Sequence, residues 1–284
     1  MDEALYRHWR QVEEVIDAAL AEDAVSRDVT TQALVPPHLE GRARIQAKAD
    51  GVLAGIDVAR QVFARVDPSL RFQAMAADGS RVARGDVVAT IGGSTASILT
   101  AERTALNFLC HMSGIATETA RYVEAVRGCR ARMTDTRKTT PGIRPLEKYA
   151  VRAGGGESHR EDLGAMVLIK DNHLAALKRQ GLGIGDAVAR ARAHADVRVE
   201  VEVESIAQAE EALSAGADII MLDNMSLAEM RRAVALAAGR CLVEASGGVT
   251  LASVRAVAET GVDLISVGAL THSAPALDLG LELE

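Results

Sequence analysis

Apolar residues in the second half of the chain fall into six short runs, and alanine-rich segments separate the later ones. The runs have the length and β-branched composition of buried strands, and the segments between them have helical periodicity. Strands that alternate with helices favour a parallel sheet with right-handed crossovers. We therefore expect strands at residues 131–134, 166–169, 197–203, 219–222, 241–243 and 264–267, and helices at 206–215, 227–238 and 251–259.

The chain up to about residue 100 has a different pattern. Val12, Ile16 and Leu20 recur at helical spacing, and the residues that follow form short runs broken by glycine. Such runs at 42–47, 51–55 and 87–91, with Asp-Gly and Gly-Asp pairs between them, indicate strands joined by turns. The pattern predicts a small α+β domain ahead of the parallel sheet.

A helix is expected to lead from this domain into the second half. Leu106, Leu109 and Met112 recur at three-residue spacing and form an apolar stripe on one helix face. Thr100 has the side chain of an N-cap, and Glu102 suits the positive end of the helix dipole. The helix is therefore predicted to begin at Thr100.

Polar residues gather where the expected strands of the second half end. They occupy positions 135–138, 170–172, 223–224, 244–248 and 266–268. Barrels of the (β/α) type build their sites at the carboxyl ends of their strands. This placement favours a barrel, complete or incomplete, over a doubly wound sheet.

Basic residues are concentrated in residues 136–160, and Lys170 follows at the end of the next strand. Glycines and a proline interrupt the segment, so a solvated helix face explains it less well than a loop cluster at the strand ends. Guanidinium and ammonium groups that converge suit a small polyanion that carries carboxylates or phosphates. The segment contains two glutamates and six basic residues, namely Arg137, Lys138, Arg144, Lys148, Arg152 and Arg160.

Valine and charged residues alternate strictly in residues 197–204. In a strand, the valines point to one side and Glu200, Glu202 and Glu204 to the other. An exposed edge strand is one interpretation, but expected helices flank the segment and both faces of a parallel sheet are covered. The glutamates are then expected to point into the barrel, near Asp223. Such carboxylates can hold Mg²⁺ through a phosphorylated substrate or stabilise a developing cation.

Two strand ends contain glycine, namely Ser246-Gly247-Gly248 and Gly268. Glycine lets backbone N–H groups approach a phosphate, and a helix N-terminus adds a favourable dipole. The last loops of (β/α) barrels are the usual phosphate site. The sequence contains no Ser-His-Asp arrangement at recognisable spacing and no Gly-x-Ser-x-Gly motif, so it points to no nucleophile.

Composition narrows the function classes. The 284 residues have a net charge of −7 and contain one Trp, three Tyr and three Phe, which argues against a nucleic acid as partner. The N-terminal residues contain no apolar signal segment, and no run is long enough to span a membrane. Three widely spaced cysteines indicate free thiols in a reducing compartment. We therefore expect a cytoplasmic protein that acts on small molecules.

Six motifs, in order, resemble the quinolinate phosphoribosyltransferase family from about residue 20 to the end of the chain. The resemblance implies an α/β protein with an N-terminal open-faced sandwich domain at 1–104, joined by 272–284, and an incomplete (β/α) barrel at 105–271. Ser158 stands where the family's Gly-Gly-x-Asn-His-Arg motif has asparagine. The motifs are Glu102-Arg103-Thr104-Ala105-Leu106-Asn107, Asp135-Thr136-Arg137-Lys138-Thr139-Thr140-Pro141-Gly142, Glu147-Lys148-Tyr149-Ala150-Val151-Arg152, Leu168-Ile169-Lys170-Asp171-Asn172-His173, Met221-Leu222-Asp223-Asn224 and Glu244-Ala245-Ser246-Gly247-Gly248.

The resemblance also implies an enzyme of NAD biosynthesis. Such an enzyme transfers phosphoribosyl from phosphoribosyl pyrophosphate to quinolinate with Mg²⁺, and it releases nicotinate mononucleotide, pyrophosphate and CO₂. It forms a homodimer in which Arg103 reaches the neighbouring subunit's site. The resemblance assigns the anion pocket to Thr136, Arg137, Lys138, His159, Arg160 and Lys170. It assigns the ribose and metal contacts to Glu202 and Asp223. It assigns the phosphate cradle to Ser246, Gly247, Gly248, Val267, Gly268 and Ala269.

Lys138, Glu202 and Asp223 are the expected catalytic residues. Lysine and Mg²⁺ neutralise the departing pyrophosphate, and a carboxylate stabilises the oxocarbenium-like ribose carbon that the pyridine nitrogen attacks. Two alternatives stay open. One is a phosphoribosyltransferase of this fold that acts on another pyridine acid, and the other is a non-catalytic relative associated with molybdenum transport. The intact stretch at 169–173 and the inward carboxylates disfavour the second.

Overall fold

The structure, a computed structural model, describes residues 3–284. Internal contacts divide the chain into two units. Unit 1 takes in the chain up to Ala120 together with Lys138–Gly155 and Ala269–Glu284, and unit 2 contains Arg121–Arg137 and Gly156–Gly268. These units differ in detail from domains 1–104 and 105–271, which stay a prediction.

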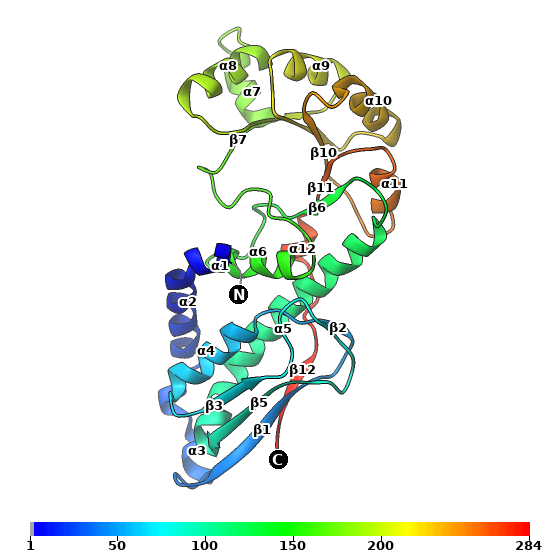
Figure 1. The fold of residues 1–284 in the computed structure, drawn as a ribbon. Helices are drawn as coiled ribbons and strands as arrows, with labels where there is room; N and C mark the ends of the chain where they lie inside the picture. The colour runs from blue at the N-terminus through cyan, green and yellow to red at the C-terminus, as the bar shows by residue number, and fades with distance from the viewer. Residues whose placement is uncertain (1–2) are drawn as a thin grey trace. The chain divides into compact units, whose positions relative to one another are not determined.

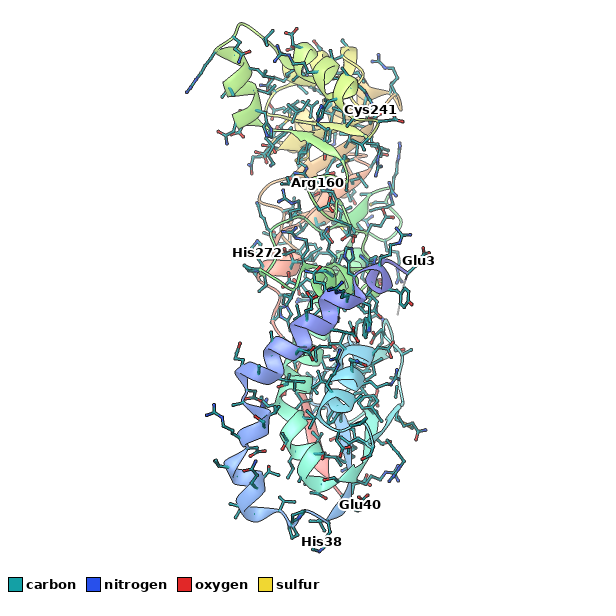
Figure 2. All side chains as sticks on the ribbon, turned by 90° about the vertical axis from the view of Figure 1, so that its left-hand side faces the viewer. Glu3, His38, Glu40, Arg160, Cys241 and His272 are labelled. Atoms are coloured by element: carbon teal, nitrogen blue, oxygen red, sulfur yellow. The ribbon has the colours of Figure 1, made fainter. Side chains whose placement is uncertain are left out.

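Unit 1 contains a four-stranded antiparallel sheet in the order β12-β1-β5-β3. In β1, Ala43, Ile45 and Ala47 are fully buried and alternate with half-buried residues, as in a strand with one face on a core. β12 closes one edge of this sheet from the far end of the chain (Figure 1). The strands are β1 (Glu40–Ala47), β3 (Arg71–Ala74), β5 (Val87–Ser94) and β12 (Leu279–Leu283), with a separate pair of β2 (Gly51–Val52) and β4 (Arg81–Val82).

Helices complete unit 1. α4 buries Val58, Val62 and Phe63, and the Phe63 ring lies 5.7 Å from that of Phe72 in β3. The predicted helix through Val12 and Leu20 is confirmed as α2. The helices are α1 (Glu3–Arg7), α2 (Trp9–Glu22), η1 (Val25–Arg27), α3 (Val29–Leu34), α4 (Ile56–Val66), α6 (Arg144–Ala153), α12 (Ala269–His272) and most of α5 (Thr95–Ala125).

The predicted start of α5 at Thr100 is wrong, because the helix begins at Thr95. Ser94 Oγ accepts a hydrogen bond from the backbone N–H of Ser97 (3.3 Å) and so serves the first turn. Thr100 lies inside the helix, and its hydroxyl donates to Asp28 Oδ2 (2.9 Å). The threonine that resembles an N-cap therefore makes a tertiary contact instead.

Gly114 of α5 lies against backbone from the end of the chain. A Cβ atom at this position would be 2.2 Å from the carbonyl oxygen of Pro275 and 2.8 Å from the Cα of Ala276. The backbone N–H of Leu277 donates to the carbonyl of Cys110 (3.0 Å), one helical turn before Gly114. Only glycine lets this segment cross α5 so closely.

Unit 2 contains a six-stranded parallel sheet in the order β6-β11-β10-β9-β8-β7. Within the described residues β6 and β7 remain its two edges, so the barrel is incomplete, and the α/β class predicted from the alternation of strands and helices is confirmed. The helices between the strands lie along the outer side of the curved sheet (Figure 1). The elements are β6 (Arg132–Thr134), β7 (Val167–Ile169), α7 (Asp171–Lys178), α8 (Ile184–His194), β8 (Val199–Val203), α9 (Ile206–Ser214), β9 (Ile219–Asp223), α10 (Leu227–Ala237), β10 (Leu242–Ser246), α11 (Val254–Ala258) and β11 (Leu264–Ser266).

Among residues 3–284, every helix is either too short or too polar to cross a lipid bilayer. All three cysteines are free thiols; Cys241 is buried, and Cys110 and Cys129 are half-buried.

Candidate active site

The carboxyl ends of four neighbouring strands in unit 2 are aligned in register. Ser246 of β10 pairs with Asp223 of β9 on one side and with Ser266 of β11 on the other, and Ser266 pairs with Thr134 of β6. Because parallel strands end at the same edge of a sheet, polar side chains from distant parts of the sequence meet here. The edge strand β6 also pairs, through Thr134, with Glu157.

β8 carries two glutamates, Glu200 near its start and Glu202 near its carboxyl end. Val199, Val201 and Val203 are fully buried on one face of the strand, and Glu200 is fully buried on the other. The Glu202 side chain keeps 11% of its surface exposed. The prediction that both faces of this strand are covered is confirmed. The prediction that Glu204 also points into the barrel is wrong, because Glu204 lies beyond the end of β8 and is exposed.

His159 lies between two buried carboxylates. Its Nε2 is 3.0 Å from Glu244 Oε2 and 3.1 Å from Glu200 Oε2, and both glutamate side chains are fully buried. Ser266 Oγ donates to the other oxygen of Glu244. The backbone N–H of His159 donates to Asp135 Oδ1 (3.0 Å), which fixes the residue beside the end of β6.

These contacts determine the charge of the histidine. Burial alone lowers the pKa of His159, but its hydrogen bonds to Glu200 and Glu244 and their negative charges outweigh burial and raise the pKa to about 10. Burial and the neighbouring Glu244 carboxylate raise the pKa of Glu200. The imidazole is therefore a cation at neutral pH.

Three further cations of unit 2 are the predicted residues Arg137, Arg160 and Lys170. Arg160 is 9% exposed, and its guanidinium donates to the carbonyl of Met166 (3.2 Å). Burial and the nearby charge of Arg137 lower the pKa of Arg160. Arg137 Nε is buried and has no hydrogen-bond partner among residues 3–284. An anion would supply the missing acceptor.

Lys170 follows β7 and remains accessible. Its Nζ donates to Glu202 Oε2 (2.7 Å), and 44% of its side chain is exposed. The backbone N–H of Lys170 donates to His173 Nδ1 (2.9 Å) at the start of α7. Glu202 thus holds the lysine at the strand ends.

The residues of the predicted phosphate cradle end or follow β10 and β11, and the end of β10 pairs with the end of β9. Gly247 has a φ of +91°, and a Cβ atom there would lie 2.4 Å from Asn224 Oδ1. Asn224 itself has a φ of +54° and donates through Nδ2 to Asp223 Oδ2 (3.2 Å). The loop after Ser246 therefore requires glycine at its first position.

Of the predicted site residues, three lie in unit 1. Arg103 on α5 and Lys138 are exposed, and Ala269 begins α12. The carbonyl of Lys138 accepts a hydrogen bond from the hydroxyl of Thr271 (2.7 Å). The other predicted residues lie in unit 2, at or just after the strand ends: Thr136, Arg137, His159, Arg160, Lys170, Glu202, Asp223, Ser246, Gly247, Gly248, Val267 and Gly268.

The predicted convergence of all six basic residues of 136–160 at strand ends is wrong for three of them. Arg144, Lys148 and Arg152 lie on α6 in unit 1, because Pro145 stands at the start of a helix that the glycines at 154 and 155 follow. Lys148 is fully buried there.

Glu244 was not among the site residues predicted from the sequence. The feature that could have identified it is a carboxylate inside the otherwise apolar strand β10, because a buried charge needs a partner. Among the described residues, only His159, Glu200 and Glu244 bring three ligand atoms of metal-binding type within 4.8 Å of one another. The hydrogen bonds of His159 Nε2 already occupy this group, and the predicted Mg²⁺ neighbours Glu202 and Asp223 are not part of it.

Comparison with known proteins settles the family. The family model described as the quinolinate phosphoribosyl transferase N-terminal domain matches residues 28–113, and the one for its C-terminal domain matches residues 115–282. The chain belongs to the quinolinate phosphoribosyltransferase family. A probable nicotinate-nucleotide pyrophosphorylase [carboxylating] of Synechocystis is 43% identical over 97% of this chain and 93% of its own. The nicotinate-nucleotide pyrophosphorylase [carboxylating] of Mycobacterium leprae is 44% identical over 95% and 96%.

Solved structures give the same result. NadC from Streptococcus pyogenes matches with a TM-score of 0.92 and 46% identity, covering 96% of each chain. The nicotinate-nucleotide pyrophosphorylase of Francisella tularensis matches with a TM-score of 0.91 and 37% identity over 97% of this chain and 96% of its own. Human nicotinic acid phosphoribosyltransferase, at 14% identity and a TM-score of 0.61, shares the fold alone.

Proposed function

We propose that this protein transfers phosphoribosyl from phosphoribosyl pyrophosphate to quinolinate. The reaction removes CO₂ and gives nicotinate mononucleotide and pyrophosphate, a step in NAD biosynthesis. The observation that carries the proposal is the match of both domain models of this family, which together cover residues 28–113 and 115–282. The free thiols support a reducing, cytoplasmic setting.

The cations of unit 2 suit a dicarboxylate. His159 is charged at neutral pH, Arg137 has a buried N–H without an acceptor among the described residues, and Arg160 lies close enough for the two guanidinium charges to repel. Repulsion between neighbouring cations is relieved when a dianion binds between them. Two carboxylates on adjacent pyridine carbons supply that charge, whereas a monocarboxylate supplies half of it.

The residues at the ends of β8 and β9 suit the ribose and the metal. Glu202 and Asp223 present carboxylate oxygens, which are the donors that Mg²⁺ prefers. When bound with phosphoribosyl pyrophosphate, Mg²⁺ neutralises the departing pyrophosphate. Glu202 and Asp223 stabilise the positive charge that develops on the ribose carbon, and Lys138 and Lys170 attract the phosphates.

Decarboxylation follows from the chemistry of the pyridine ring. Attack by the ring nitrogen makes it a cation, and this charge stabilises the electron pair left on the adjacent carbon when CO₂ departs. The protein contributes position and charge, with no covalent enzyme intermediate. This agrees with the absence of a nucleophile motif from the sequence.

Product analysis tests the reaction. The purified protein is incubated with Mg²⁺ and phosphoribosyl pyrophosphate, and with either quinolinate or nicotinate. Nicotinate mononucleotide with stoichiometric CO₂ from quinolinate alone is the expected result. Turnover of nicotinate alone would replace quinolinate by another pyridine acid, and no turnover by folded protein in either tube would favour a non-catalytic anion-binding protein.

We further propose a homodimer in which Arg103 completes the neighbouring subunit's site. The exposure of Arg103 on α5 supports this proposal. Arg103→Ala and Lys138→Ala should each be nearly inactive, because each leaves a negative charge of the substrates unpaired. Mixed heterodimers should recover part of the activity, since one of their two sites is intact. Inactive heterodimers would refute the shared site.

A further inference from the structure

Two buried carboxylates inside the strands of unit 2 have no part in the proposed reaction. Glu200 of β8 and Glu244 of β10 are fully buried, and burying an ionised carboxylate is costly unless a counter-charge is close. Their oxygens meet at one cation, the Nε2 of His159, at 3.1 and 3.0 Å. The pair is built around this ring.

The surrounding groups hold the Glu244 carboxylate and the backbone of His159 in place. Thr134 Oγ1 and Ser266 Oγ are 2.9 Å apart, and Ser266 donates to Glu244, so three neighbouring strands hold that carboxylate in place. Asp135 accepts the backbone N–H of His159, and the guanidinium of Arg160 follows next in the chain. The charged groups in contact with His159 are thus two carboxylates at Nε2 and one carboxylate at its backbone N–H.

The other ring nitrogen is free to bind a ligand. Within residues 3–284, His159 makes hydrogen bonds through its backbone N–H and Nε2 and none through Nδ1. In a neutral ring with its proton on Nε2, Nδ1 carries a lone pair and repels a carboxylate. With both nitrogens protonated, Nδ1 becomes a donor. Whether His159 attracts or repels an anion therefore depends on the two glutamates behind it.

We propose that Glu200 and Glu244 are positioning residues that keep His159 a fixed cation, so that its Nδ1–H always donates to a carboxylate of the substrate. The inference rests on the proposed function for the identity of that carboxylate. An ordinary histidine, with a pKa near 6.5, is about 10% charged at pH 7.5. With a pKa of about 10 the ring is essentially fully charged at this pH.

Histidine NMR of the intact protein tests the charge directly and needs no turnover. The seven histidines are labelled with ¹⁵N, and the His159 signals are identified by their loss in His159→Gln. His159 should keep imidazolium shifts up to about pH 9, and its midpoint should fall by at least one pH unit in Glu244→Gln. A wild-type midpoint near 6.5, or an unchanged midpoint in Glu244→Gln, would overturn the proposal.

Glu147→Gln is the matched control. Glu147 is also fully buried and bound to a histidine, since its Oε1 lies 2.9 Å from His111 Nε2 in unit 1. This variant should change the His111 signals and leave the His159 midpoint unchanged. If Glu244→Gln fails to fold, Glu200→Gln removes the other carboxylate from Nε2 and should also lower the His159 midpoint.

Steady-state kinetics separate positioning from general damage. KM for quinolinate should be flat between pH 6.5 and 8.5 in the wild type. In Glu244→Gln it should rise toward tenfold per pH unit above the new midpoint, while KM for phosphoribosyl pyrophosphate stays unchanged. Equal changes in both KM values would refute the positioning role. Absence of quinolinate turnover would refute the proposed function but not the role of Glu200 and Glu244, because the NMR titration measures the charge of His159 without turnover.

Discussion

Gly114→Ala is expected to destabilise unit 1. The added methyl group would lie 2.2 Å from the carbonyl oxygen of Pro275 and 2.8 Å from the Cα of Ala276. Both atoms belong to backbone, so no side-chain rotation can relieve the clash. The segment at 275–276 would have to move by about 1 Å to reach a normal van der Waals separation.

The magnitude follows from three contributions. Overpacking costs about 1–3 kcal/mol, and displacement of the segment strains the hydrogen bond from Leu277 to Cys110, worth about 1 kcal/mol. Alanine in place of glycine inside a helix raises the free energy of unfolding by about 1 kcal/mol. The net loss in free energy of unfolding is therefore about 1–3 kcal/mol.

Urea unfolding monitored by Trp9 fluorescence measures this loss. Trp9, the single tryptophan, lies in α2 of unit 1 and reports on the unit that contains Gly114. With a slope of about 2–3 kcal/mol/M, the midpoint should fall by about 0.3–1.5 M. Gly92→Ala in β5 is the control, because a Cβ atom there would lie 3.4 Å from the end of the Arg71 side chain, an ordinary contact. If Gly114→Ala unfolds at the wild-type urea concentration, the close crossing is not a constraint.

Three further outcomes are expected. Lys170→Met and Glu202→Gln should each lower kcat by about 100-fold or more, because each removes a charge at the reacting groups; initial rates that fall less than threefold would contradict their roles. Removal of Mg²⁺ with EDTA should abolish turnover but leave the thermal midpoint of the substrate-free protein unchanged, and a lower midpoint would indicate a resident metal. Asp28→Ala should cost about 1 kcal/mol at pH 7, because Asp28 Oδ1 caps α3 at the backbone N–H of Thr31 (2.9 Å). Hydrogen bonds from Thr31 and Thr100 lower the pKa of Asp28, so its contribution is present above the unfolded pKa near 3.9. That contribution disappears as the pH falls through the folded value, and urea midpoints at pH 7 and pH 3 test the difference.

The parallel sheet could be predicted because its signals are local. A segment of alternating apolar and charged residues between two helices has both faces covered when it lies inside a parallel sheet, and β8 lies inside such a sheet. Parallel strands also end at a common edge, so the polar residues at the ends of β7, β9 and β10 could be placed together from the sequence.

The contacts of His159 could not be predicted in the same way. His159 lies 41 residues from Glu200 and 85 from Glu244, and periodicity gives the face of a strand, not the loop that packs against it. The pairing of Glu157 with Thr134 brings His159 to the strand ends, and the sequence carries no local signal for that bridge. The predicted start of α5 is wrong for a related reason. The sequence cannot distinguish a threonine that caps a helix from one, such as Thr100, whose hydroxyl binds a distant residue.

The pairing of β12 with β1 has a consequence for synthesis of the protein on the ribosome. Arg44 in β1 pairs with Glu282, so the edge of the first sheet has no partner until nearly the whole chain has emerged. Unit 2 is complete once Gly268 is available, and unit 1 also needs Ala269–Glu284. The unit that contains the N-terminal part of the chain is thus the last to finish folding, and until then its open strand edge exposes it to chaperones and to mispairing with other nascent chains.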